Sequence, residues 1–166
     1  MRVVALVAVL GLALAGSASA RPAAAPTCAT VPSSTVQAAL GGTMQGTPGI
    51  GNSKIGGLAY LTCTYNATAN ITFISPTTSS AFASLLAMLK KATKVSTVTG
   101  IGTSAFSGTG SNTSSTCTAG GSCKMVTVTA QNLWVYVAGK AIFEISVGKG
   151  SLSREESLAK TIIKLL

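Results

Sequence analysis

The stretch KMVTVTAQNLWVYVAGKAIFEISV, residues 124–147, decides the fold, because it alternates apolar and polar residues and is rich in β-branched and aromatic side chains. We predict that it forms three strands, Lys124–Ala130, Leu133–Ala138 and Ala141–Val147. They are separated only by Gln131-Asn132 and by a turn around Gly139-Lys140, which leaves no room for a crossover helix. The stretch therefore predicts an antiparallel three-strand meander.

Further strands are predicted upstream of the meander. Leu58–Tyr65 and Asn70–Ser75 alternate and contain β-forming residues, so they indicate a hairpin with its turn at Asn66–Ala69. Two shorter strands follow, Val95–Val98 and Ala105-Phe106. The Gly-rich segment 41–57 and the polar segment 107–122 are predicted to be loops.

A short helix and a long helix are predicted before residue 92. The short one is capped by Ser33, Ser34 or Thr35 and ends before Gly41-Gly42. The long one begins at Ser79 or Ser80 and ends at Lys90-Lys91, where positive charge favours the helix dipole. Its apolar residues recur at the spacing of an amphipathic helix: Phe82, Leu85, Leu86 and Leu89.

A third helix closes the chain. Ser153 and Glu156 match a capping box, and Leu158, Ile162 and Leu165 form its apolar stripe. Helices that are segregated from closely spaced strands predict an α+β domain. We expect an antiparallel sheet with a C-terminal three-strand meander, packed by two main helices plus a short N-terminal helix.

The chain begins with the features of a secretory signal peptide. Arg2 is followed by the apolar run Val3–Leu14 and by Ala18-Ser19-Ala20, a small-residue cleavage site. The apolar run is shorter than the ~20 residues that a transmembrane helix needs. We therefore expect a signal peptide at 1–20, cleaved near Ala20, and a protein that is secreted or held in the extracytoplasmic cell envelope. A Pro/Ala linker (21–27) and a single domain (28–166) then follow.

Four cysteines are consistent with disulfides in an exported chain: Cys28, Cys63, Cys117 and Cys123. Three pairings are formally possible. Only five residues separate Cys117 from Cys123, which favours this pair and leaves Cys28 with Cys63. A metal site is the alternative, but the chain has no His or Asp, and we predict neither a metal nor another cofactor.

The charge is strongly basic, with 12 Lys plus Arg against 3 acidic residues and a net charge of +9. The basic residues are scattered rather than clustered, which argues against nucleic-acid binding. Peripheral contact with an anionic envelope polymer or membrane surface is one interpretation. The plainer interpretation is a solvated basic surface that keeps a monomer soluble.

Few residues could support catalysis. With no His, acid–base chemistry would depend on Glu144, Glu155 and Glu156, and the last two are explained by the first turn of a helix. Ser157 and Lys160 match an S-x-x-K pair without the accompanying motifs of the enzymes that use it. We therefore predict that the protein is not an enzyme.

One face of the meander is the candidate ligand groove, formed by Thr127, Thr129, Trp134, Tyr136 and Glu144. The turn at Gly139-Lys140 decides its composition. A two-residue turn places Trp134 and Tyr136 with Phe143 and Ile145 as core. A three-residue turn places them beside Glu144 on a half-polar, aromatic face, which a binding cleft favours. Core packing remains the alternative for both aromatic residues.

Spaced motifs along the mature chain carry a family resemblance: Cys28, Val36–Gly41, Cys63–Tyr65, Phe82-Ala83, Val98–Phe106 and Leu158–Lys160. In these motifs the chain resembles actinobacterial exported or lipoprotein domains of unknown function, which are similar in layout to the extracellular sensor domains of bacterial Ser/Thr kinases. The resemblance implies an envelope-associated, non-catalytic role in ligand capture or sensing. The chain departs from the pattern because no lipobox precedes Cys28 and because Thr103 stands where an acid is frequent.

Three functions follow as hypotheses. The first is a cell-envelope or secreted binding or sensor-like domain with an unknown ligand or protein partner. The second is a structural or protein-interaction component of the envelope, which would expose an apolar patch. The third is a small secreted hydrolase that uses Glu144 or Ser157. The resemblance favours the first and transfers no functional residue to this chain.

Overall fold

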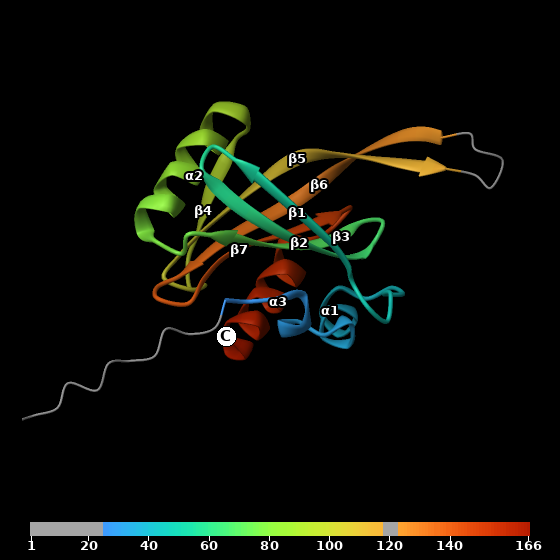
Figure 1. The fold of residues 1–166 in the computed structure, drawn as a ribbon, viewed down its shortest axis with the longest axis horizontal. Coiled ribbons are helices and arrows are strands. Elements are labelled where there is room, and N and C mark those ends of the chain that lie inside the picture. The colour runs from blue at the N-terminus through green and yellow to red at the C-terminus, as the bar shows by residue number, and fades with distance from the viewer. Residues whose placement is uncertain (1–24, 118–122) are drawn as a thin grey trace, which may run out of the picture.

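The computed structural model describes residues 25–117 and 123–166, and the side chains in these ranges except those of 111–117 and 123–128. The predicted signal peptide at 1–20 and the first part of the predicted linker lie outside the described residues. In the described part, seven strands form one antiparallel sheet in the order β1-β2-β3-β7-β6-β5-β4. With three α-helices beside this sheet, the predicted α+β class is confirmed (Figure 1).

The strands are β1 (Gly49–Ile55), β2 (Leu58–Asn66), β3 (Ala69–Ser75), β4 (Val95–Val98), β5 (Ser104–Cys117), β6 (Cys123–Val137) and β7 (Ala141–Gly148). The helices are the 3-10 turn η1 (Cys28–Thr30), α1 (Ser33–Leu40), α2 (Ser79–Ala92) and α3 (Leu152–Leu165). The predicted hairpin of β2 and β3 is confirmed to within one residue at each strand end.

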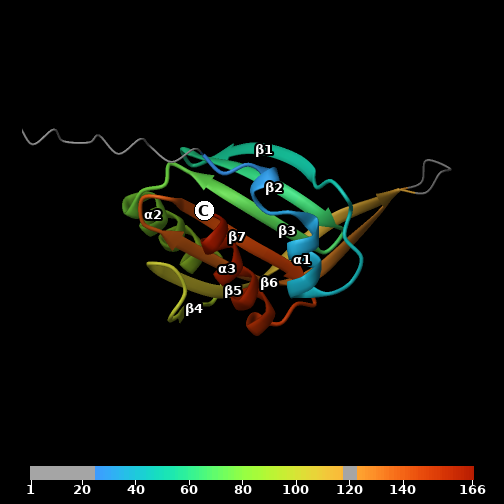
Figure 2. The same cartoon turned by 90° about the horizontal axis from the view of Figure 1, so that it is seen from below.

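The sheet consists of two antiparallel meanders, β1-β2-β3 and β4-β5-β6-β7, which join where β3 pairs with β7. Helices α1 and α3 lie on one side of the sheet and α2 lies on the other (Figures 1 and 2). We call these sides the α3 face and the α2 face. Because side chains alternate along a strand, odd-numbered residues of β2, β3, β6 and β7 lie on the α3 face and even-numbered residues on the α2 face.

The larger core lies under α3. Its central strand residues include Ile71, Val135, Phe143 and Ile145. The buried stripe of α3 that packs on them is Glu155, Leu158, Ala159 and Ile162. Leu165, which was predicted for this stripe, is 46% exposed, because the spacing i, i+3, i+4, i+7 begins at Glu155 instead.

The N-terminal segment is fastened to β2 at two neighbouring points. Cys28 in η1 forms a disulfide with Cys63, so this predicted pair is confirmed. The Tyr65 hydroxyl donates a hydrogen bond of 2.8 Å to the carbonyl oxygen of Val31. Cys117 pairs with Cys123 in the strand register, but their side chains lie outside the described ones, so that second disulfide stays a prediction.

Two predictions of loops and turns in the second half of the chain were wrong. Segment 107–122 was predicted to be a loop, yet β5 runs to Cys117 and pairs with β6 along its whole length. Gln131-Asn132 is not a turn, since β6 passes through it without a break. The meander therefore consists of β5, β6 and β7. Backbone pairing between long antiparallel strands needs no apolar side chains, so a Ser/Thr/Gly-rich stretch can still form a strand.

Strand β1 was also missed, because the Gly-rich segment 41–57 was predicted to be a loop. Residues 49–55 pair with β2 at the edge of the sheet, and every one of them is exposed. An exposed edge strand lacks the apolar alternation that identifies half-buried strands.

All three helix starts differ from the prediction, and Pro32 rather than Ser33, Ser34 or Thr35 occupies the N-cap position of α1. The hydroxyl oxygen of Thr78 caps α2 by accepting a hydrogen bond of 3.1 Å from the Ala81 amide, one residue before the predicted Ser79. Helix α3 begins after Ser151, so the predicted capping box of Ser153 and Glu156 does not form. Ser and Thr are frequent at these helix starts, and the pattern alone could not separate the true cap from its neighbours.

Candidate functional site

The turn between β6 and β7 determines which residues lie beside Trp134. Val137 pairs with Ala141, so the turn holds three residues, as in the second predicted register. Trp134 consequently pairs with Glu144, and Tyr136 lies two residues further along the same face. The structure thus brings Trp134, Tyr136 and Glu144 together on the α2 face.

Helix α2 covers the two aromatic residues. Phe82 stacks on Tyr136 with ring centroids 5.6 Å apart and lies 5.0 Å from the ring of Phe106. Phe106 stacks on Trp134 at 5.2 Å. Trp134 is 3% exposed, whereas Tyr136 is half-buried. These rings belong to a second core beneath α2. Such packing is the alternative to a ligand groove that the sequence analysis left open for Trp134 and Tyr136.

Glu144 is a partly buried carboxyl group beside this core. Burial raises its pKa to about 7, and a hydrogen bond from the Trp134 indole N–H acts in the opposite direction. Burial and then the charge of Glu144 raise the pKa of Tyr60 on β2. The other two acids of the chain belong to α3, on the opposite side of the sheet. Glu144 therefore has no second carboxylate with which to perform paired acid–base chemistry.

Thr129, which was predicted for the same surface, does not join it. Because β6 is continuous, Thr129 and Leu133 point to one face and Trp134 points to the other. Thr129 is exposed. Thr127 in β6 pairs with Thr113 in β5, and its side chain lies outside the described ones.

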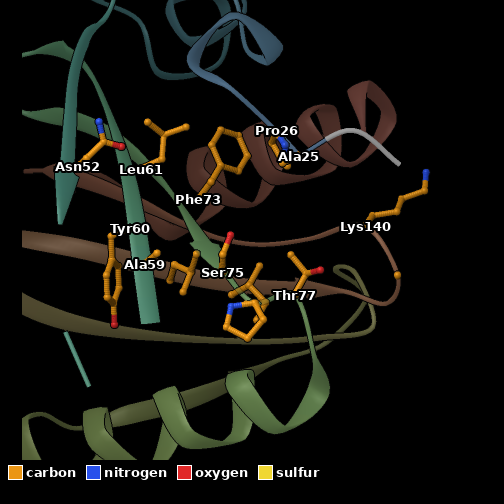
Figure 3. A pocket seen from close by; sticks show the side chains of 14 residues that line it. Ala25, Pro26, Asn52, Ala59, Tyr60, Leu61, Phe73, Ser75, Thr77 and Lys140 are labelled. Carbon is orange, nitrogen blue, oxygen red and sulfur yellow. The ribbon is translucent and has the colours of Figure 1, made fainter. Parts of the chain in front are cut away.

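A cavity of about 510 Å³ opens at the ends of β2 and β3, and residues from both faces of the sheet line it (Figure 3). Leu61 and Phe73 pair directly across these strands and form its apolar floor. Pro26, from the segment before η1, lies on the same side as they do, whereas Tyr60 points the opposite way, toward α2 (Figure 3). We call this cavity the β2–β3 groove.

The polar residues of the β2–β3 groove lie around its apolar floor. Asn52 on β1 pairs with Leu61 and lies on one side of the groove, and Lys140 from the β6–β7 turn lies on the opposite side (Figure 3). Ser75, at the end of β3, is exposed beside the floor. Phe73 is 4% exposed and Leu61 is half-buried, so the floor is partly open to a ligand.

Sequence analysis missed this groove for two reasons. Its outer wall belongs to β1, which was predicted to be a loop, and Ala25-Pro26 was assigned to a linker. The alternation of Ile50, Asn52 and Lys54 with Gly and Ser is the signal that could have revealed a strand there.

The remaining catalytic candidates are separated from both the groove and Glu144. Glu155 is fully buried in α3, and burial raises its pKa to about 8. Ser157 and Lys160 are exposed on the same helix. Within the described ranges, no three His, Cys, Asp or Glu side chains gather closely enough to hold a metal ion.

The segment Gly100–Ala105, which leads from β4 into β5, has a packing role. A Cβ atom on Gly102 would lie 2.7 Å from the carbonyl oxygen of Tyr136, so the loop approaches β6 more closely than a side chain permits. Thr103, at the position where the resemblance leads one to expect an acid, accepts a hydrogen bond of 2.9 Å from the Ala138 amide through its hydroxyl oxygen. Both residues hold the loop against the end of β6.

Comparison with known proteins adds no assignment: the chain matches no protein-family profile, no curated protein and no solved structure. Among the helices of the described residues, none combines the length and apolar character needed to span a bilayer. The class that fold and site define is thus a small α+β domain with a groove at the end of its sheet.

Proposed function

We propose that the protein is an exported, non-catalytic binding domain whose ligand site is the β2–β3 groove. The observation that carries this proposal is an open cavity of about 510 Å³ with an apolar floor and a few polar side chains around it. Small-molecule sites typically have volumes of roughly 300–1,000 Å³ and this mixture of lining residues.

Two further features support the proposal. The signal-like N-terminus and the Cys28–Cys63 disulfide favour export into an oxidising compartment. A chain with no His and only three acidic residues favours binding over hydrolysis. The resemblance to exported sensor-like domains points to the same role.

The test is binding of N-phenyl-1-naphthylamine, a neutral probe that fluoresces in apolar sites. The mature protein should bind it saturably at one site. Asn52→Phe, which fills the groove from an exposed strand, should abolish this binding, whereas Ser53→Phe, on the opposite face of the same strand, should leave it unchanged. Saturable binding that is equal in both variants would contradict the assignment of the groove.

A role as a protein-interaction component is the second candidate, and the β1 edge favours it. Ile50 and Ile55 on this fully exposed edge strand are 68% and 62% exposed, and such an edge can pair with a partner strand. Hydrogen exchange would then show β1 amides protected when cell-envelope extract is added. Exchange that does not change on addition would exclude strand pairing at β1.

A further inference from the structure

We infer that the β2–β3 groove binds an anionic amphiphile, with its apolar chain on Leu61 and Phe73 and its carboxylate or phosphate group between Lys54 and Lys140. This inference rests on the proposed function and adds the chemical class of the ligand. It depends on the charges at one end of the groove and on the composition of its floor.

The two lysines stand at opposite sides of the same end of the groove. Lys54 on β1 pairs with Ala59, and Ala59 pairs with Ser75, so these residues form the cross-strand row next to the floor. Lys140 directly precedes β7, the next strand beyond β3. Three inter-strand spacings of about 4.8 Å place the two lysine backbones roughly 14 Å apart. Both flexible side chains can therefore reach a headgroup that lies between them.

Strand alternation places Lys54 on the correct face. Lys54 lies two residues from Asn52, which lines the groove, so both side chains project from the same face of β1. Lys140 lines the groove itself. The end of the groove near Ser75 is thus flanked by two positive charges, because Lys140 lines it and Lys54 projects beside it from β1.

No acidic side chain lines the groove or stands between these lysines in the described residues. Glu144 points to the α2 face, where it meets Trp134. Glu155 and Glu156 lie in the first half of α3, whose Arg154 contacts the Leu40 carbonyl oxygen at the end of α1. An anion bound between Lys54 and Lys140 would therefore meet none of the three glutamate side chains there.

The floor explains why the ligand needs an apolar part. Leu61, Phe73 and Pro26 present apolar surface that a small inorganic anion would leave in contact with water. A neutral hydrocarbon would cover this floor but would leave the lysines without a counter-charge. An amphiphile with an anionic group would cover the apolar floor and would also supply a counter-charge to the lysines.

The experiment is isothermal titration calorimetry of the mature protein with four ligands that carry a ten-carbon chain and with one inorganic anion. Decanoate and decyl phosphate should bind at least about tenfold more tightly than decanol, decyltrimethylammonium or inorganic phosphate. Decanol binding as tightly as decanoate would overturn the inference, because the charge would then contribute nothing. Inorganic phosphate binding as tightly as decyl phosphate would overturn it equally, because the apolar floor would be irrelevant.

Charge-reversal variants locate the headgroup. Lys54→Glu and Lys140→Glu should each weaken decanoate binding by about tenfold and leave decanol binding unchanged. Lys91→Glu, at an exposed position at the end of α2, is the matched control and should change neither. Equal losses in all three variants would show only a general charge effect and would overturn the assignment to the groove.

The two proposals fail in different ways. If the naphthylamine probe binds in the groove and decanoate is not preferred over decanol, the inference of an anionic ligand is wrong, but the proposed binding function of the groove stands. If neither the probe nor any decyl ligand binds, both proposals are wrong.

Discussion

At the residue scale, the carboxyl group of Glu155 couples folding stability to pH. This side chain is fully buried, and neither of its oxygens has a hydrogen-bond partner among the described residues. Burial raises its pKa to about 8, from about 4.3 in an unfolded chain. The folded protein consequently holds a proton that the unfolded chain releases.

The free energy of unfolding should therefore fall as pH rises from about 4.5 to about 8. The stabilisation is fully present below the pKa that Glu155 has in the unfolded chain, and it is lost as the pH rises to the pKa of the folded protein. At ~1.4 kcal/mol per pKa unit, the loss amounts to a few kcal/mol. Glu144 adds to the same trend, since its pKa is also raised, to about 7. Urea unfolding of Glu155→Gln should show a flatter pH dependence than the original chain. Glu156→Gln, one residue along α3, is the control, and an equal flattening there would contradict the assignment to Glu155.

Gly102 is the second residue whose role can be tested alone. It has φ +58°, and an added Cβ atom would meet the Tyr136 carbonyl oxygen at 2.7 Å. Gly102→Ala should destabilise the protein by about 2–4 kcal/mol, the sum of left-handed strain and steric overlap. Gly100→Ala has a similar φ of +77° but no atom within 4 Å, so it should lose only about 1 kcal/mol. Thermal unfolding of both variants measures the difference, and equal losses would exclude the close approach.

At the element scale, α2 is held to the sheet by a ladder of aromatic rings that contains the single tryptophan, Trp134. Phe82→Ala should cost about 3–5 kcal/mol and shift the Trp134 emission to longer wavelength, because water then reaches the ring. Met88→Ala, on the exposed side of α2, should change stability by less than about 0.5 kcal/mol and leave the emission unchanged. Unchanged Trp134 emission in Phe82→Ala would show that α2 does not shield the indole.

Elements whose apolar residues follow one period could be predicted from the sequence. The β2–β3 hairpin and α2 alternate or repeat clearly, and their bounds agree with the structure to within one or two residues. Strand β1 and all of β5 beyond Phe106 could not be predicted, because long-range backbone pairing forms them and their Gly, Ser and Thr residues indicate loops. The sequence analysis attributed Glu155 to the first turn of a helix, because nothing in the sequence pattern marks a carboxyl group as buried.

At the scale of the whole molecule, the candidate site was harder to predict than the fold. Trp134, Tyr136 and Glu144 lie on one face, as the register with a three-residue turn predicted. This could be predicted because the alternation of side chains along a strand depends only on nearby residues. The β2–β3 groove needs a wall from Pro26 and a rim from Asn52 and Lys140, which are distant in the chain. Only the assembled sheet brings these residues together.

The same assembly leaves a surface with little negative charge. Of the three acids in the chain, Glu155 is buried and Glu144 is half-buried, whereas the described lysines are largely exposed. The protein should therefore sediment with vesicles that contain anionic lipid and not with neutral vesicles. Adding about 0.5 M NaCl should release it, because the screening length then falls to roughly 4 Å. Equal sedimentation with both kinds of vesicle would show that charge does not drive the contact.

The position of the Cys28–Cys63 bond has one more consequence. Ala25 and Pro26, which form part of the wall of the groove, stand only three and two residues before Cys28. A thiol reductant that opens this bond would leave the segment that carries this wall with the hydrogen bond from Tyr65 to Val31 as its described fastening to β2. We therefore expect reduction to weaken ligand binding in the proposed groove before the sheet unfolds.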